Sequence, residues 1–102
     1  MIIMGNEENF DELINKDIVL VDFFATWCGP CRMLGPVLDE VAEDRSDFDI
    51  VKVDIDQDPS LAQKYGVMSV PTLIIFKQGE PVAIRNGFMP KELLVEWVNE
   101  NK

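Results

Sequence analysis

The chain has 102 residues, of which 47% are hydrophobic, and this length and composition are typical of one small folded domain with a single hydrophobic core. Nine basic residues against 19 acidic ones give a formal net charge of −10. That balance argues against a nucleic-acid partner, because such affinity depends on neutralisation of phosphates by lysine and arginine. We therefore predict a single domain over residues 1–102.

The first part of the chain predicts a short strand followed by a helix. Residues 2–4 are apolar and favour an edge strand, and Asn6 is a candidate N-cap for the helix that follows. Phe10, Leu13 and Ile14 recur at helical spacing, so we expect them to share the buried face.

Residues 18–24 predict a central strand buried on both faces, because the run is apolar except at Asp22. Period-two alternation places Asp22 on the same face as Leu20 and Phe24. A carboxylate among such neighbours is either a satisfied structural group or an acid whose pKa is raised by burial, as functional acids often are.

The segment Cys28-Gly29-Pro30-Cys31 lies where this strand gives way to a helical pattern that begins near Cys31. Unpaired N–H groups and the positive end of the helix dipole stabilise a thiolate at such a position, which makes it nucleophilic at neutral pH. The second thiol is close enough to attack a mixed disulfide formed on the first. The spacing therefore predicts a dithiol–disulfide switch.

The rest of the chain alternates between strand and helix patterns. Strands are expected at residues 50–55, 72–76 and 82–84, with a hairpin at Gln78-Gly79 that makes the last two antiparallel. A short helix should end at Gly66, and an amphipathic helix over residues 90–101 should bury an apolar set consisting of Leu93, Leu94, Trp97 and Val98. The alternation predicts an α/β sandwich with a mixed sheet and helices on both faces.

Nothing in the sequence predicts export or membrane insertion. The apolar residues 1–4 are too few for a secretory signal and lack a basic leader, and no window approaches the ~20 apolar residues of a membrane span. We expect a cytoplasmic protein. In that reducing compartment an isolated cysteine pair is typical of catalysis or metal binding rather than of a structural disulfide.

A metal site within one chain is disfavoured by the inventory of ligands. Structural zinc sites use four ligands, and the chain has no histidine and no third cysteine. A metal shared between two chains is the remaining form of this alternative. We predict no metal and no cofactor.

The segment Phe23-Phe24-Ala25-Thr26-Trp27-Cys28-Gly29-Pro30-Cys31 resembles the active site of the thioredoxin family. The likeness extends over the chain through 54–56, 70–72, 76–79 and Gly87. The resemblance implies the thioredoxin fold, a three-layer α/β/α sandwich with a five-stranded mixed sheet flanked by four helices. It also implies a general protein disulfide reductase that acts on disulfide-containing proteins.

The same resemblance assigns roles to individual residues. It implies that Cys28 is an exposed attacking thiol and Cys31 a shielded resolving thiol, and Gly29-Pro30 is the pair typical of reducing members. It further implies that Asp22 is a buried acid behind the disulfide, with Lys52 as its neighbour. By its own pattern Lys52 is equally a solvated strand residue.

Substrate contacts are implied for a second group of residues. Pro71 matches a cis proline that faces the cysteines, and the backbone of Val70 is expected to pair with an extended substrate segment, which makes recognition largely independent of substrate sequence. Trp27 and Gly87 are expected to line the same surface.

The chain departs from the family pattern at three positions. Phe24 replaces a frequent tryptophan, Asn86 stands where a small apolar residue is commoner, and Phe88 stands where alanine is frequent. The last two are expected in a loop facing the substrate groove, where they bear on partner preference.

We expect a monomer that is re-reduced by a thioredoxin reductase, either a flavoprotein using NADPH or an iron–sulfur enzyme fed by ferredoxin. Two other functions share the fold. One is a binding module that supports another protein, for which a lost cysteine would be the sign. The other is an oxidase or isomerase, which differs in redox potential.

Overall fold

The computed structural model describes residues 1–102. Along the chain the elements are β1 (Ile2–Met4), α1 (Phe10–Ile14), β2 (Val19–Phe24), α2 (Gly29–Asp44), β3 (Asp49–Asp54), α3 (Pro59–Lys64), β4 (Thr72–Lys77), β5 (Glu80–Asn86) and α4 (Lys91–Glu100). No helix is long and apolar enough to span a membrane.

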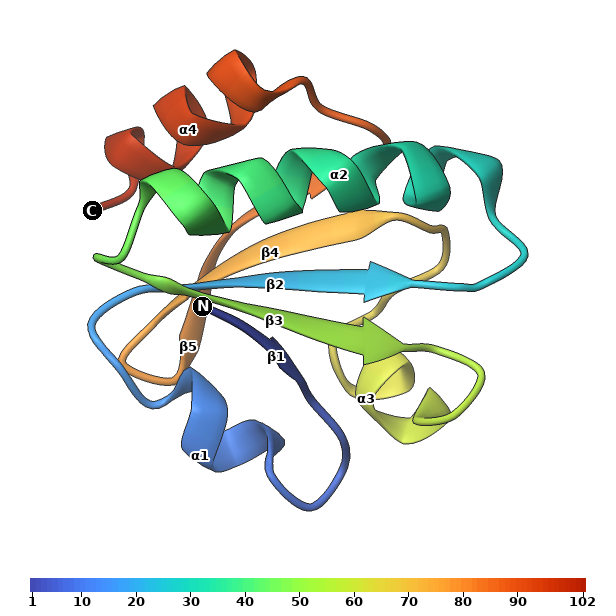
Figure 1. Cartoon of the computed structure of the whole chain (residues 1–102). Coiled ribbons are helices and arrows are strands. Elements are labelled where there is room, and N and C mark those ends of the chain that lie inside the picture. Colours follow the sequence, from blue (N-terminus) through green and yellow to red (C-terminus); the bar gives the residue numbers. More distant parts are fainter.

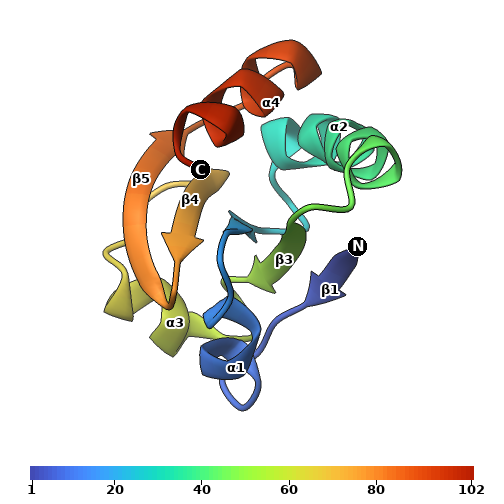
Figure 2. The ribbon, with the colours of Figure 1, turned by 90° about the vertical axis from the view of Figure 1, so that its left-hand side faces the viewer.

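The five strands form one mixed sheet in the order β1-β3-β2-β4-β5. Strands β1, β3 and β2 are parallel, and β4 runs antiparallel to both β2 and β5. Helices α2 and α4 cover one face of the sheet, and α1 and α3 cover the other (Figures 1 and 2). This three-layer arrangement confirms the predicted fold.

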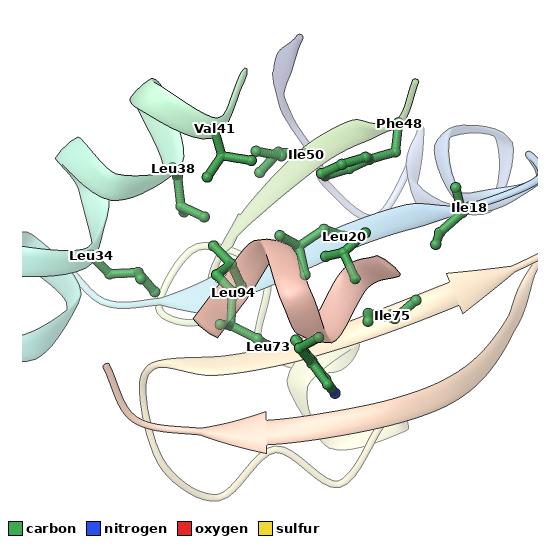
Figure 3. Close-up of a cluster of buried hydrophobic side chains, with 12 residues drawn as sticks. Ile18, Leu20, Leu34, Leu38, Val41, Phe48, Ile50, Leu73, Ile75 and Leu94 are labelled. Carbon is green, nitrogen blue, oxygen red and sulfur yellow. The ribbon is translucent and has the colours of Figure 1, made fainter. Parts of the chain in front are cut away.

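Strand β2 is the centre of both cores because its alternating side chains are buried on the two faces of the sheet. Leu20 packs with Leu34 and Leu38 of α2 beneath the α2–α4 layer (Figure 3). Val21 and Phe23 join the second cluster, between the sheet and α1 and α3. The strand register that buries β2 on both faces therefore also determines where the carboxyl end of β2 leads into α2.

Two predicted chain reversals are confirmed. Gly66, with φ of +68°, follows α3. At the β4–β5 hairpin both Gln78 (φ +53°) and Gly79 (φ +81°) adopt left-handed conformations, as the tight right-handed twist of a two-residue hairpin requires.

Two predicted details are wrong. Asn6 is not the N-cap of α1: its side-chain oxygen accepts the N–H groups of Glu8 and Asn9, at 2.9 Å each, in a turn that precedes the helix, and α1 begins only at Phe10. Leu93 is 55% exposed, because α4 packs through positions spaced three and four apart, which leaves its neighbour in sequence facing outward.

Candidate active site

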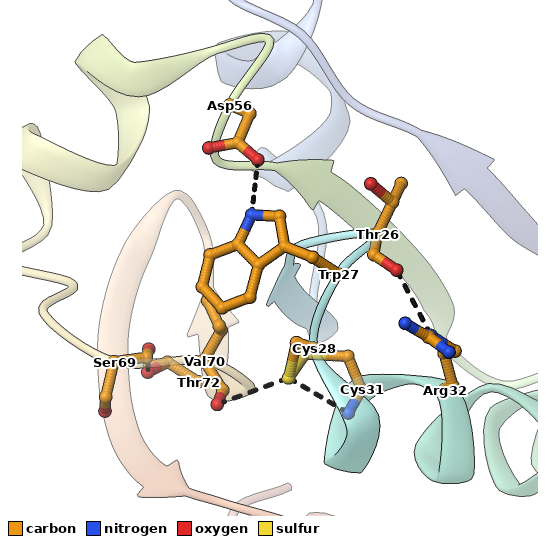
Figure 4. Close-up of a disulfide and its surroundings, with 9 residues drawn as sticks. All are labelled: Thr26, Trp27, Cys28, Cys31, Arg32, Asp56, Ser69, Val70 and Thr72. Atoms are coloured by element: carbon orange, nitrogen blue, oxygen red, sulfur yellow. Dashed lines mark hydrogen bonds between the residues drawn. A yellow bond between two sulfur atoms is a disulfide. The ribbon is translucent and has the colours of Figure 1, made fainter.

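The two cysteines lie at the junction of β2 and α2, at the carboxyl edge of the parallel strands. Helix α2 begins at Gly29, two residues before the predicted start, so Cys28 is its N-cap. Proline suits the first turn because its missing N–H would have no partner inside the helix there. The Cys28 Sγ accepts the Cys31 N–H at 3.2 Å, so a helix N-terminus donates directly to that sulfur (Figure 4).

Cys28 and Cys31 are joined by a disulfide, with their Cα atoms 5.2 Å apart. In this oxidised form both residues are buried, Cys28 at 5% exposure and Cys31 at 7%. The predicted contrast between an exposed Cys28 and a shielded Cys31 is therefore wrong for the disulfide form. The reason is that both sulfurs pack in a small apolar cluster with Ala25, against Phe24 and Val70.

Trp27 forms one border of this cluster and is 63% exposed. Its indole Nε1 donates a hydrogen bond to the Asp56 carboxylate at 2.8 Å, which ties the loop before the disulfide to the segment after β3 (Figure 4). A large apolar ring is thus held in a defined place beside the sulfurs while remaining open to solvent. Asp56 lies within residues 54–56, one of the segments that resemble the family, but nothing in the sequence indicated this pairing with Trp27.

The segment before β4 forms the opposite border. The Val70–Pro71 peptide bond is cis, as the resemblance implies, and the Val70 carbonyl oxygen lies 3.6 Å from the Cys28 Sγ. The Val70 N–H makes no hydrogen bond within the chain. Gly87 lies beside this segment, since its N–H donates to the Pro71 carbonyl oxygen at 2.8 Å.

Asp22 is 1% exposed on β2, and its Oδ1 has no hydrogen-bond partner in the protein. Strand alternation directs it to the face of the sheet covered by α2, the helix that carries Cys31. Burial raises the pKa of the Asp22 carboxyl to about 7, and the positive charge of Lys52 acts in the opposite direction. A carboxyl in this state can release or take up a proton near neutral pH.

Lys52 faces Asp22 across the β2–β3 register, yet the two form no ion pair. Its ammonium nitrogen lies 4.8 Å from the centre of the Phe24 ring. The Phe24 ring thus holds the lysine by a cation–π contact. No sequence pattern indicated this contact, because Phe24 and Lys52 are on neighbouring strands but not directly opposite.

The structure places a Cys-x-x-Cys at a helix N-terminus, opposite a cis proline, at the edge of a sheet that lies between two pairs of helices. These features are those of a thiol–disulfide oxidoreductase. The thioredoxin family profile matches residues 1–100. The chain is 52% identical to the thioredoxin of Staphylococcus haemolyticus and 50% identical to that of Staphylococcus aureus, over 98% of this chain and 97% of each relative.

A mutant thioredoxin from Halobacterium salinarum has a similar structure, with a TM-score of 0.91 and 37% identity over 97% of this chain and 88% of that one. The chain belongs to the thioredoxin family. It is a protein disulfide reductase that acts by thiol–disulfide exchange, with disulfide-containing proteins as substrates and a thioredoxin reductase as partner.

Proposed function

We propose that Cys28 is the nucleophile of this exchange and Cys31 the resolving thiol. The observation that carries the assignment is the hydrogen bond from the Cys31 N–H to the Cys28 Sγ, because it stabilises negative charge on that sulfur and on no other. Gly29 and Pro30 form the first turn that aims this N–H at the sulfur.

The proposed reaction has two exchanges. The Cys28 thiolate attacks one sulfur of a substrate disulfide, which forms a mixed disulfide and releases the other substrate sulfur as a thiolate. Cys31 then loses its proton and attacks the Cys28 Sγ, so that the Cys28–Cys31 disulfide forms and the second substrate thiolate leaves. Two electrons pass from the chain to the substrate, and two electrons from the reductase restore the dithiol.

Asp22 is the proposed acceptor of the Cys31 proton, directly or through a water molecule. Its pKa of about 7 suits both accepting a proton during resolution and losing it to solvent afterwards. Lys52 acts through Asp22, since its positive charge keeps that pKa from rising further.

The substrate binds over the disulfide, between Trp27 on one side and the Val70–Pro71 segment on the other. The Val70 N–H has no internal partner, and its carbonyl oxygen adjoins the sulfur, so both are available to an extended substrate backbone. Gly87 lines this surface through its bond to Pro71. Such pairing gives affinity with little dependence on substrate sequence.

The biological setting completes the proposal. The chain acts as a monomeric domain over residues 1–102 in the cytoplasm, and its reductase is either an NADPH-dependent flavoprotein or a ferredoxin-fed iron–sulfur enzyme. Turnover with one purified reductase of each type, followed as insulin reduction, identifies the electron donor.

The assignment of the two thiols is tested by trapping. Reduced Cys31→Ser protein mixed with an insulin disulfide should accumulate a mixed disulfide on Cys28, visible by non-reducing electrophoresis and mass spectrometry. The matched Cys28→Ser variant should accumulate little. Equal trapping by both variants, or wild-type insulin reduction no faster than dithiothreitol alone, would contradict the proposal.

A further inference from the structure

Thr72, the first residue of β4, lies directly after the proposed substrate-binding segment and is 1% exposed. Its hydroxyl oxygen is 2.6 Å from the Ser69 carbonyl oxygen and 2.9 Å from the side-chain oxygen of Asn86. Asn86, the last residue of β5, is the Cα partner of Thr72 in the β4–β5 register. Figure 4 shows Ser69, Val70 and Thr72 together on one side of the disulfide.

The hydroxyl has one proton, so it donates to only one of these two oxygens. The Ser69 carbonyl is the closer and receives no backbone N–H. A half-turn of the Asn86 amide about its last side-chain bond presents its NH2 group to Thr72 instead, and every group is then satisfied. The resulting chain runs from the Asn86 amide to the Thr72 oxygen and from the Thr72 proton to the Ser69 carbonyl.

Few other hydrogen bonds hold the segment between Gly66 and Thr72. Met68 is 97% exposed, and the Val70 N–H has no partner within the chain. Besides the bond from the Thr72 hydroxyl, the hydrogen bond that restrains residues 69–71 is the one from the Gly87 N–H to the Pro71 carbonyl, and Val70 also packs against the disulfide. Both restraints originate at the end of β5, one from the side chain of Asn86 and one from the backbone of its neighbour.

We propose that Asn86 is a positioning residue for protein substrates: through the Thr72 hydroxyl it fixes the Ser69–Pro71 backbone that pairs with the substrate main chain. This inference rests on the proposed role of Val70 and Pro71 in substrate binding. Asn86 touches neither sulfur, so its effect is on binding of an extended polypeptide and not on the exchange between sulfurs. An apolar residue at this position leaves the buried Thr72 oxygen without its donor.

Two variants with opposite hydrogen-bonding capacity test the arrangement. Asn86→Val removes the donor, while Asn86→Asp keeps the size of the side chain but supplies a carboxylate that only accepts, so it draws the Thr72 proton away from Ser69. Losing one such bond corresponds to about a fivefold weaker interaction. With dithiothreitol in excess, KM for insulin should rise about fivefold in Asn86→Val and at least as much in Asn86→Asp, with kcat nearly unchanged.

The rate of reduction of a small aromatic disulfide is the second readout, because a general disturbance of the active site would change this rate as well as the KM for insulin. Because such a compound presents no main chain to Val70, its rate of reduction should be the same in Asn86→Val and in wild type. Thr72→Val should raise KM for insulin on its own, and adding Asn86→Val to it should have no further effect, because the two residues act in series. Asn101→Ala is the matched control, since its amide also donates a hydrogen bond, to the Trp97 carbonyl at 2.9 Å, at the end of a distant helix.

Urea unfolding of each variant shows that it is folded. A wild-type KM in both Asn86 variants overturns the inference while leaving the disulfide reductase function intact. Equal slowing with insulin and with the small disulfide overturns it as well, as does a full additional effect of Asn86→Val in the Thr72→Val background. If the wild-type protein fails to reduce insulin, the proposed function falls and this inference falls with it.

Discussion

At Asp22 a single ionisable group is placed where its charge is disfavoured. Its carboxyl is almost fully buried, one oxygen has no partner, and its pKa is raised to about 7. The nearest compensation is Lys52, whose ammonium instead lies over the Phe24 ring. The residue therefore opposes folding whenever it is ionised.

Replacing Asp22 with Asn should stabilise the fold in a pH-dependent manner. In the folded chain the pKa of Asp22 is about 7, above the reference value of 3.8. Below pH 4 Asp22 is therefore protonated in both the folded and the unfolded chain, and it makes stability independent of pH there. Between pH 4 and 7 only the unfolded chain releases the proton, so wild-type stability falls as pH rises. The gain in free energy of unfolding of Asp22→Asn over wild type therefore levels off above pH 7 at about 4 kcal/mol. The cost of burying the asparagine amide is subtracted from this gain at every pH.

Urea unfolding of both proteins from pH 4 to 8 measures this difference, and single-turnover insulin reduction should be slowed in the variant. Lys52→Gln is the opposing control. It removes the nearby positive charge and so raises the folded pKa of Asp22 further, which should extend the fall in stability to a higher pH and make the total fall larger. A gap between Asp22→Asn and wild type that stays constant over this pH range would contradict a buried carboxyl with a raised pKa.

Among the elements, the β4–β5 hairpin contributes to the candidate active site although its turn lies at the opposite end of the sheet. Its turn is anchored to the end of α1, because Gln78 N–H donates to the Lys16 carbonyl at 2.7 Å and Gly79 N–H to the Ile14 carbonyl at 3.1 Å. Strand β5 then runs back to Asn86 and Gly87 at the active-site edge. The turn at one end of the sheet thus helps to position, at the other end, the segment proposed to bind substrate.

Gly79→Ala should lower the free energy of unfolding by about 1 kcal/mol, because a left-handed φ is strained for a residue with a Cβ. No steric clash contributes, since the nearest atom to the added Cβ is 3.9 Å away. Gly35→Ala is the matched control: inside α2, with open space around it, the same change should stabilise by about 0.5–1 kcal/mol. Urea unfolding should therefore show shifts of opposite sign, and equal shifts would contradict the argument.

Over the whole molecule the charges are strongly unbalanced. The net charge of −10 is carried by a body of 30 × 29 × 20 Å, and only four acidic residues are within ion-pair distance of a basic one: Asp11, Asp44, Asp47 and Asp49. Surface ion pairs contribute about 0–1 kcal/mol each. Repulsion among the remaining carboxylates therefore outweighs attraction at low ionic strength.

Added salt should stabilise the protein. Raising NaCl from about 0.01 to 0.3 M shortens the Debye length from about 30 Å to below 10 Å, which screens repulsion across the molecule. The urea midpoint should rise over this range. Glu96→Gln removes one exposed, unpaired carboxylate, so it should raise the midpoint at low salt and weaken the salt dependence. A midpoint that falls with salt would show that the ion pairs dominate instead.

The elements and the sheet could be predicted because their signals are local. The apolar run of β2, the alternation in β3 and the Gln78-Gly79 turn each encode their own conformation through side-chain period or backbone preference. The errors at Asn6 and Leu93 have a common cause. A helix start and a helix face are settled by which competing hydrogen bond or packing partner is available, and that depends on neighbouring segments.

The sequence alone determined the fold and the chemistry of this protein, because hydrophobic periodicity sets the layers and a Cys-Gly-Pro-Cys at a strand-to-helix junction sets the redox reaction. Tertiary structure decided which groups surround that reaction. The burial of both sulfurs in the disulfide, the contact of Lys52 with Phe24 and the link from Asn86 through Thr72 to Ser69 all join segments distant in sequence or on separate strands. Such contacts depend on strand register and side-chain packing, which no local pattern of residues records.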